Sequence, residues 1–296
     1  MSESDCHARE GYVAVPGGRI WYRVVGSGPG IPLLTLHGGP GDPHDYLEPL
    51  EALGDERPVV FYDQLGCGKS DRPDDPALWR VERFVDELRL VRKALGLERV
   101  HILGHSWGSM LATDYALTSP AGLLSLVLVS PPLSIPRWLA DLARYRRELP
   151  TGIQRALDRH EAAGTTDSPE YLAATMQFYR RHLCRLHPWP DELTKSATDA
   201  GLAVYHAMWG PTEFFMTGVL KDYDRTDRLH EISVPTLFAC GRYDEATPEA
   251  TAWYQSLLPG SEMVVFERSA HMPMLEERER FVDVVGRFLR RADEHR

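Results

Sequence analysis

A serine between two glycines has the clearest chemical potential in this chain of 296 residues. Ser106 is the centre of the pentapeptide G-H-S-W-G at residues 104–108, which follows an apolar run and precedes a helical pattern. In a sharp strand-to-helix turn of this kind the serine hydroxyl stands clear of the backbone, and the glycines let strand and helix pack closely. The pattern therefore predicts nucleophilic catalysis by Ser106 through a covalent acyl-enzyme.

A second glycine-rich segment is suited to stabilise the negative charge that develops when a serine attacks a carbonyl group. Residues 37–41 read H-G-G-P-G and follow an apolar run at residues 32–36. A loop in this place supplies one backbone N–H group to the oxyanion hole, and the residue after the nucleophile supplies the other. We therefore expect the backbone N–H groups of Gly39 and Trp107 to bind the oxyanion.

A serine nucleophile also needs a base and an acidic group, which follow it in the chain in the order acid and then histidine. Asp244 follows the apolar run at residues 237–239, and His271 follows a predicted strand at residues 263–266. Active groups of open α/β sheets collect at these carboxyl ends of strands. We predict that His271 accepts the Ser106 proton and that Asp244 fixes the imidazole tautomer and stabilises the imidazolium.

Several neighbouring features are interpreted as structural. His105 is expected to pack beside the nucleophile, because adjacent side chains diverge at a tight turn, and Asp63 is expected to organise the loop at residues 63–70. The glycine-rich residues 26–30 lack the phosphate-binding spacings and are interpreted as a turn. The four cysteines show no C-x-x-C spacing, so we expect free thiols and neither a metal nor a cofactor.

The order of apolar runs predicts an α/β protein with a mostly parallel central sheet and an inserted helical cap. A hairpin is expected at residues 12–25, strands at 33–36, 59–62, 100–103, 124–129, 236–240 and 263–266, and helices at 81–95, after Ser106, near 249–258 and at 277–290. Residues 136–228 contain helical patterns, at 138–149, 171–186 and 202–209, and almost nothing that indicates a strand. We therefore predict a core domain at 1–131 and 229–296, with the cap at 132–228 inserted after the sixth core strand.

Charge and hydropathy exclude some classes of partner. The formal net charge of −10 and the absence of a long basic block argue against nucleic acid. No stretch approaches the roughly 18 apolar residues of a membrane span, so no membrane partner is expected and a cytoplasmic location is predicted. The oligomeric state is left open, and a monomer is compatible with the sequence.

Four motifs together resemble the proline iminopeptidase family of α/β hydrolases. They are H-G-G-P-G at residues 37–41, D-Q-L-G-C-G-K-S at 63–70, G-H-S-W-G at 104–108 and G-P-T-E-F at 210–214. The resemblance extends from about residue 12 to 290, and residues 168–171 and 189–190 resemble the tricorn-interacting aminopeptidase branch in particular. It implies the α/β-hydrolase fold and the release of an N-terminal residue, proline or another small or apolar one, from a peptide or amide with a free amine. It also implies that Glu213 and Glu245 bind that amine.

The chemistry of such a substrate agrees with this implication. The ammonium group is two bonds from the attacked carbonyl carbon, so an anionic group must lie within a few ångströms of Ser106, and Glu245 is adjacent to Asp244. An acylated amine would be rejected, because a buried carboxylate without a partner costs several kcal/mol. The expected partner is a small peptide or an aminoacyl amide. The aromatic residues around Glu213 either line a pocket for an apolar first residue or belong to the core; they are Tyr205, Trp209, Phe214 and Phe215.

Three alternatives remain. An aminoacyl amide hydrolase that trims an aminoacyl group from a macrolactam-type biosynthetic intermediate would keep the amine site. A carboxylesterase or lactonase would keep Ser106, Asp244 and His271 but would not need Glu213 and Glu245. A ligand receptor without catalytic activity is disfavoured, because the nucleophile, acid, base and oxyanion segments are all present.

Overall fold

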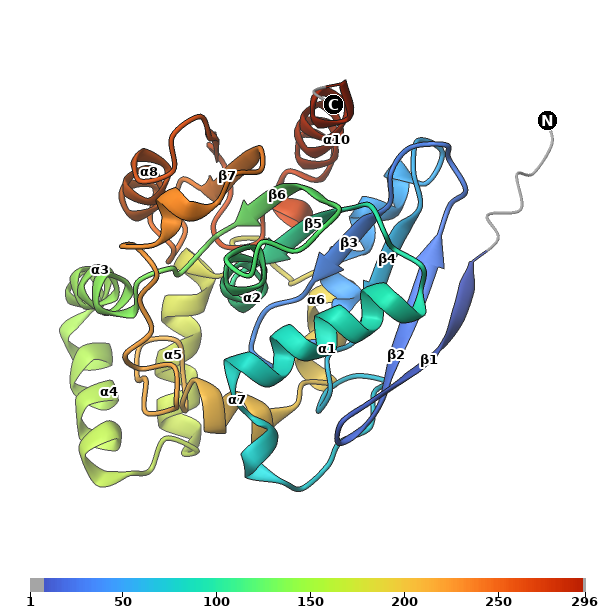
Figure 1. Cartoon of the computed structure of the whole chain (residues 1–296). Helices are drawn as coiled ribbons and strands as arrows, with labels where there is room; N and C mark the ends of the chain where they lie inside the picture. The colour runs from blue at the N-terminus through green and yellow to red at the C-terminus, as the bar shows by residue number, and fades with distance from the viewer. Residues whose placement is uncertain (1–7, 295–296) are drawn as a thin grey trace.

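An eight-stranded sheet forms the centre of the molecule (Figure 1). The structure is a computed structural model that describes residues 8–294. The strands are β1 (Arg9–Val15), β2 (Gly18–Val25), β3 (Leu33–Leu36), β4 (Val59–Tyr62), β5 (Val100–His105), β6 (Leu123–Val129), β7 (Thr236–Gly241) and β8 (Glu262–Phe266). Their order is β1-β2-β4-β3-β5-β6-β7-β8. The β1–β2 hairpin is antiparallel, β2 pairs antiparallel with β4, and the remaining pairs are parallel, which confirms the predicted mostly parallel sheet.

Helices cover both faces of this sheet. Those outside the insertion are η1 (His44–Leu53), η2 (Pro76–Leu78), α1 (Val81–Ala94), α2 (Trp107–Ala116), α8 (Pro248–Ser256), α9 (Pro273–Glu276) and α10 (Arg278–Glu294). Successive strand residues point to opposite faces. Ile102 of β5 therefore belongs to the apolar cluster that contains side chains of α1 and α2, and Leu103 belongs to the cluster that contains side chains of η1 and α10. Burial on both faces explains why these strands are continuous apolar runs.

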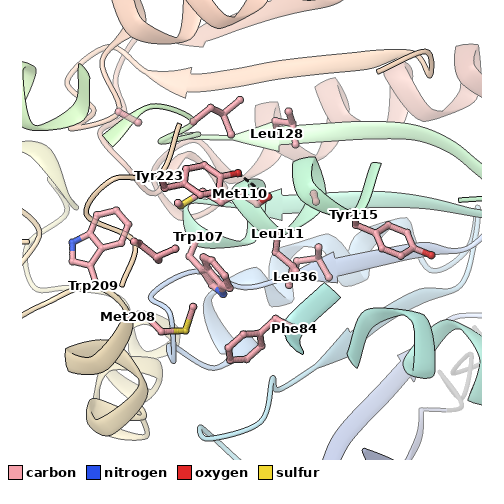
Figure 2. Close-up of a cluster of buried hydrophobic side chains, with 14 of the residues drawn as sticks. Leu36, Phe84, Trp107, Met110, Leu111, Tyr115, Leu128, Met208, Trp209 and Tyr223 are labelled. Atoms are coloured by element: carbon pink, nitrogen blue, oxygen red, sulfur yellow. Dashed lines mark hydrogen bonds between the residues drawn. The ribbon is translucent and has the colours of Figure 1, made fainter. Parts of the chain in front are cut away.

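The helix after Ser106 is anchored in the larger of these clusters (Figure 2). Trp107, Met110 and Leu111 of α2 are fully buried, with Phe84 of α1 and Trp209 of the inserted segment among the residues around them. The Trp107 and Phe84 rings meet edge to face at 5.6 Å between centroids. Each such side chain contributes about 1.5–3 kcal/mol on burial, so packing fixes the start of α2 and with it the turn that carries Ser106.

A helical segment without a β-strand separates β6 from β7 within the described part of the chain. Its helices are α3 (Ile135–Arg147), α4 (Thr151–Ala163), α5 (Pro169–His182), α6 (Asp191–Thr198) and α7 (Leu202–Met208), and η3 (Leu229–Glu231) leads back to β7. Figure 1 shows α3, α4 and α5 together at one end of the molecule, away from β1. The predicted helices match α3, α5 and α7, whereas α4 and α6 were not predicted. Buried side chains of α3 and α5 belong to the same apolar cluster as those of α1 and α2, and the division into core and cap domains stays a prediction.

Among residues 8–294 no helix has the length and apolar character needed to cross a membrane. The cytoplasmic location stays a prediction. Cys67, Cys184 and Cys240 are buried and free, as expected, and Cys6 lies outside the described residues.

Candidate active site

Ser106 occupies a sharp turn between β5 and α2. Its backbone has φ 52° and ψ −120°, a left-handed conformation that costs a residue other than glycine on the order of 1–3 kcal/mol. The flanking glycines are required by close backbone contacts: a Cβ atom on Gly104 would lie 2.2 Å from the carbonyl oxygen of Gly108, and one on Gly108 would lie 2.1 Å from that of Leu36. The predicted strand–turn–helix geometry around Ser106 is therefore present.

His271 and Asp244 meet because they follow neighbouring parallel strands, β8 and β7. The distance from His271 Nδ1 to Asp244 Oδ1 is 2.7 Å. Asp244 is fully buried, and its other oxygen accepts hydrogen bonds from Ser130 Oγ at 2.6 Å and from the Gly241 backbone N–H at 3.2 Å. The ring is thus oriented with Nδ1–H toward Asp244, which leaves Nε2 as the nitrogen that can accept a proton.

The electrostatic surroundings of His271 favour its protonated form. Burial by itself lowers the pKa of the imidazole, but the charge of Asp244 and the hydrogen bond to it outweigh burial, so that the pKa lies above its usual value. A general base needs this stabilisation at the moment when it takes up the proton of a nucleophile.

The loop that carries His271 is held by a carboxylate that the sequence interpretation did not find. Glu276 Oε2 accepts hydrogen bonds from the backbone N–H groups on both sides of His271, at 2.8 Å from Ala270 and 3.3 Å from Met272. The only sequence signal for this role is the position of Glu276 shortly after the histidine, in the four-residue helix α9. We interpret Glu276 as a positioning residue.

The end of α5 contacts both loops that carry the candidate residues. The carbonyl oxygen of His182 accepts a hydrogen bond from the Glu245 backbone N–H at 3.3 Å, and that of Leu183 accepts one from the His271 backbone N–H at 3.0 Å. The last carbonyl groups of a helix lack partners within the helix. Here the loops that carry Glu245 and His271 supply the donors.

The glycine-rich loop after β3 lies directly against Ser106. A Cβ atom on Gly38 would lie 3.2 Å from the Ser106 Cβ atom. The Gly38 N–H group is bound to Tyr46 Oη at 2.6 Å, whereas in the described part of the chain neither Gly39 nor Trp107 donates its backbone N–H to a recorded hydrogen bond. Trp107 is the first residue of α2, where the N–H has no partner inside the helix. Both predicted oxyanion donors therefore remain available to a ligand.

His105 is a structural neighbour of the nucleophile, as expected. Its Nε2–H donates to the His271 carbonyl oxygen at 2.8 Å, and its Nδ1 accepts from Tyr46 Oη at 2.9 Å. Burial lowers the pKa of His105 well below the usual value. Both ring nitrogens are engaged, so this histidine has no free nitrogen with which to act as a base.

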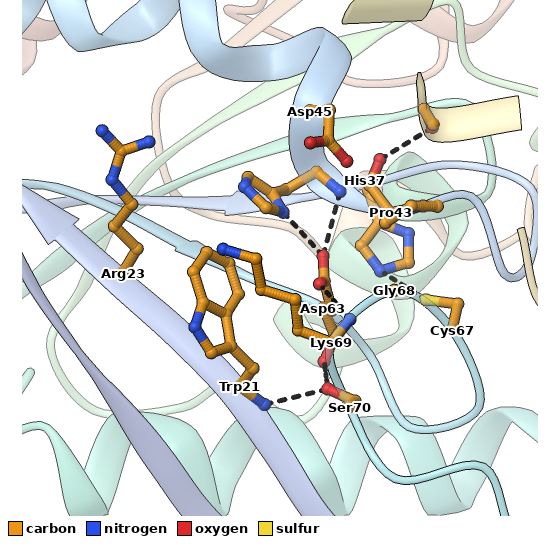
Figure 3. Close-up of polar contacts among 12 residues, drawn as sticks. Trp21, Arg23, His37, Pro43, Asp45, Asp63, Cys67, Gly68, Lys69 and Ser70 are labelled. Carbon is orange, nitrogen blue, oxygen red and sulfur yellow. Dashed lines mark hydrogen bonds and ion pairs between the residues drawn. The ribbon is translucent and has the colours of Figure 1, made fainter. Parts of the chain in front are cut away.

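Asp63 organises the loop that follows β4, also as expected (Figure 3). Its Oδ1 atom accepts from the backbone N–H and from Nδ1 of His44, at 3.1 and 2.7 Å, and its Oδ2 atom accepts from the Lys69 backbone N–H at 2.9 Å. Burial raises the pKa of this carboxyl, but the bonds to His44 outweigh it and the net shift is downward. All of these partners are structural.

Two further carboxyl groups, those of Glu245 and Glu213, lie near His271. Glu245 is fully buried, and neither of its oxygens has a hydrogen-bond partner among the described residues. Its Oε1 atom is 4.0 Å from His271 Nε2. Glu213, in the segment after α7, accepts a hydrogen bond from Tyr205 Oη at 2.6 Å.

The protein disfavours negative charge on both of these glutamates. Burial raises the pKa of Glu213 to about 7. Burial also raises the pKa of Glu245 well above its usual value, and the charges of Glu213 and Asp244 add to the effect. Buried carboxylates are normally paired, because leaving them without a partner costs several kcal/mol. A cationic ligand between Glu213 and Glu245 would supply the missing charge.

A cavity of about 340 Å³ adjoins Glu213 and is bordered by the loop after β3 and by α5, α6 and α7. Its lining is mostly apolar but includes Glu213 and Tyr205. Trp209 and Phe214 instead belong to the apolar core. Of the two roles left open for these aromatic residues, Tyr205 therefore lines the cavity, whereas Trp209 and Phe214 belong to the core.

One group of side chains has the spacing of metal ligands in the described chain, namely His44, Asp45 and Glu48. Each already has a partner: His44 binds Asp63, Asp45 pairs with Lys195, and Glu48 pairs with Arg23. The group does not line the cavity beside Glu213. We therefore assign it no role in the chemistry of Ser106.

Comparison with known proteins first defines the class. Residues 31–278 match the family model of the alpha/beta hydrolase fold, in agreement with the mostly parallel sheet and the turn at Ser106. A crystal structure of VinJ is similar with a TM-score of 0.93 and 41% identity, covering 96% of this chain and 99% of that one. The chain therefore has the predicted α/β-hydrolase fold.

The more specific similarity is to enzymes named proline iminopeptidase. The relative from Heyndrickxia coagulans is 49% identical over 282 residues, which cover 95% of this chain and 98% of the relative. The one from Saccharolobus solfataricus is 39% identical, covering 98% of this chain and 94% of the relative. A crystal structure of proline iminopeptidase from Mycobacterium smegmatis has a TM-score of 0.88 and 39% identity, covering 96% of this chain and 99% of that one. This chain belongs to the proline iminopeptidase family and is an enzyme.

Proposed function

We propose that this enzyme is a serine aminopeptidase that releases N-terminal proline, or another small apolar residue, from peptides or amides with a free amine. The observation that carries the proposal is the buried carboxyl group of Glu245, which lies 4.0 Å from His271 Nε2, has no hydrogen-bond partner among the described residues and feels the charge of Glu213. The relatives named proline iminopeptidase support proline as the first residue.

In this mechanism Ser106, His271 and Asp244 form a catalytic triad. The Ser106 oxygen attacks the carbonyl carbon of the first residue while His271 Nε2 takes the hydroxyl proton. The Gly39 and Trp107 N–H groups hold the resulting oxyanion. His271 then gives the proton to the departing amine, and the acyl group stays on Ser106. Water, activated by the same histidine, attacks this ester and releases the free amino acid.

The glutamate pair supplies the exopeptidase specificity. The ammonium of the substrate enters between Glu213 and Glu245 and compensates charges that the protein leaves unpaired. An N-acylated substrate carries no cation and would bury both carboxylates unpaired, a loss of several kcal/mol. The same cation is two bonds from the reacting carbonyl carbon, so binding also places that carbon at Ser106.

We assign residues 132–228 to a cap domain and residues 1–131 and 229–296 to the catalytic core. Support comes from the cavity, which residues of α5, α6 and α7 border from the side of the insertion and Asp42 and Met272 border from the core. In this division the core carries the triad and the cap supplies Glu213 together with most of the substrate-binding wall.

The test is kcat/KM on chromogenic anilides of proline, alanine and leucine, each with a free and with an acetylated amine. Ser106→Ala is the blank. Turnover of the free amines alone is expected, with the order of the three anilides giving the first-residue preference. Equal turnover of free and acetylated forms, or rapid ester cleavage without anilide cleavage, would replace the proposal by the carboxylesterase alternative.

A second candidate keeps the triad and the glutamates but changes the leaving group. The apolar lining of the 340 Å³ cavity favours a bulky apolar amine, as in an aminoacyl amide from a biosynthetic pathway. Comparison of prolyl or alanyl amides of a long alkyl amine with the corresponding dipeptides distinguishes the two candidates. A large preference for the alkyl amides would favour the amide hydrolase.

A further inference from the structure

Asp42 is a second carboxylate in the lining of the cavity that contains Glu213, and the proposed mechanism leaves it without a role. It directly follows the H-G-G-P-G segment, lines the same cavity as Glu213 and is partly buried. Its side chain has no recorded hydrogen bond or ion pair with any residue between positions 8 and 294. Burial raises the pKa of Asp42 to about 6, so this carboxyl still carries its negative charge at neutral pH.

The cavity that Asp42 borders is built to hold a ligand. Its volume of about 340 Å³ falls within the roughly 300–1,000 Å³ of small-molecule sites. Thr175 of α5 also lines it, and Thr175 Oγ1 is buried without a hydrogen-bond partner among the described residues. A buried hydroxyl group without a partner is uncommon in folded proteins and indicates a place where a bound molecule supplies the missing bond.

The part of the substrate that occupies this cavity follows from the proposed binding mode. The ammonium lies between Glu213 and Glu245, and the reacting carbonyl lies at Ser106. Asp42 is three residues after Gly39, which would bind the oxyanion, and it lines this cavity together with Glu213. In the proposed binding mode the part of the cavity beyond Glu213 receives the leaving group.

We propose that Asp42 is a specificity residue that selects leaving groups by charge, disfavouring a carboxylate and favouring a neutral or cationic group. The proposal rests on the proposed aminopeptidase function. In a dipeptide with a free C-terminus, the carboxylate is only two bonds from the departing nitrogen, so it must enter the cavity that Asp42 borders. Amidation of the C-terminus removes this charge without changing the shape of the leaving group appreciably.

The size of the effect follows from Coulomb's law. Two like charges several ångströms apart near a protein surface repel each other enough to lower binding about tenfold.

The experiment measures kcat/KM for prolyl-alanine and prolyl-alanine amide at pH 7.5, with the wild type, Asp42→Asn and a control, Asp74→Asn. Asp74 is exposed and does not line the cavity, so its substitution removes the same formal charge elsewhere. Prolyl anilide is measured in parallel, because it reports the aminopeptidase activity independently of a C-terminal charge.

We expect the wild type to prefer the amide about tenfold and Asp42→Asn to reduce this preference to about twofold or less, with Asp74→Asn resembling the wild type. The ratio of two substrates cancels any general loss of folded enzyme. An amide-to-acid ratio that Asp42→Asn leaves unchanged would overturn the role of Asp42. Absence of turnover of prolyl anilide and both prolyl-alanine substrates by the wild type would instead overturn the proposed function.

Discussion

Replacing Glu245 by glutamine separates recognition of the amine from the chemistry of the triad. The substitution keeps the size of the side chain and removes one buried negative charge. A carboxylate and an ammonium about 4 Å apart attract each other by about 4 kcal/mol at an effective dielectric constant of 20. Part of this attraction survives in the glutamine dipole and in Glu213. A net loss of about 2–4 kcal/mol is expected, which is about a 30- to 1,000-fold fall in kcat/KM for a free-amine substrate.

The assay compares prolyl anilide with phenyl acetate, an ester without an amine. Glu245→Gln is expected to lose activity toward the anilide by the factor above and to change ester hydrolysis less than about threefold. Glu249→Gln is the matched control, because the Glu249 side chain is 64% exposed and four residues away along the chain. Equal losses on the anilide and the ester would refute the reasoning, since they would mean that Glu245 supports the triad rather than the amine.

The same substitution has an opposite effect on stability. Glu245 is buried without a partner and is repelled by Glu213 and Asp244, so its negative charge destabilises the protein when no substrate is bound. Glu245→Gln is therefore expected to raise the Tm of the free enzyme while lowering its activity on prolyl anilide. A lower Tm together with lower activity on both substrates would indicate general damage to the fold.

Four further outcomes are expected. Ser106→Ala abolishes turnover with little change in the circular dichroism spectrum, and hydrolysis near the wild-type rate would exclude this serine as the nucleophile. Gly108→Ala lowers Tm and activity together, because the new Cβ atom would lie 2.1 Å from a backbone oxygen; an unchanged Tm would contradict this contact. Glu276→Gln is expected to lower kcat by a larger factor than it changes KM, whereas the exposed control Glu279→Gln changes neither constant. A change in KM alone would contradict a positioning role for Glu276. The pKa of Glu213 is raised to about 7 in the folded protein, so the contribution of this group to stability is lost as the pH rises from about 4.5 through 7. Glu213→Gln is therefore expected to flatten the fall of Tm between pH 5 and 8. Parallel curves of Tm against pH for the wild type and the variant would contradict the raised pKa.

The sequence predicted the sheet and the residues at its edge because both follow from local patterns. Strands buried on both faces are continuous apolar runs, and the tight turn at Ser106 leaves no room for a side chain at positions 104 and 108, which explains its two glycines. Asp244 and His271 each follow such a run, so their proximity needed only the rule that parallel strands end at the same edge of the sheet. The structure brings these two side chains to 2.7 Å.

Two helices of the insertion, α4 and α6, were harder to predict because they bury few side chains. α4 buries only Ala156 and Leu157, and α6 buries only Leu193 and Ser196, so each contributes little to the apolar core. The role of Glu276 was also hidden, because a carboxylate that binds backbone N–H groups leaves no pattern in the sequence. Contacts of this kind are visible only after the chain has folded.

The hydrogen bonds from the end of α5 limit how this enzyme can be redesigned. The backbone carbonyl groups of His182 and Leu183 accept hydrogen bonds from the loops of Glu245 and His271, so the insertion contributes main-chain contacts to the proposed reaction centre. Grafting the whole segment from a relative would change these anchoring points together with the substrate-binding wall. Side-chain replacement on α5, α6 and α7 leaves the anchors in place, and it is therefore the more conservative way to transfer substrate preference between members of the family.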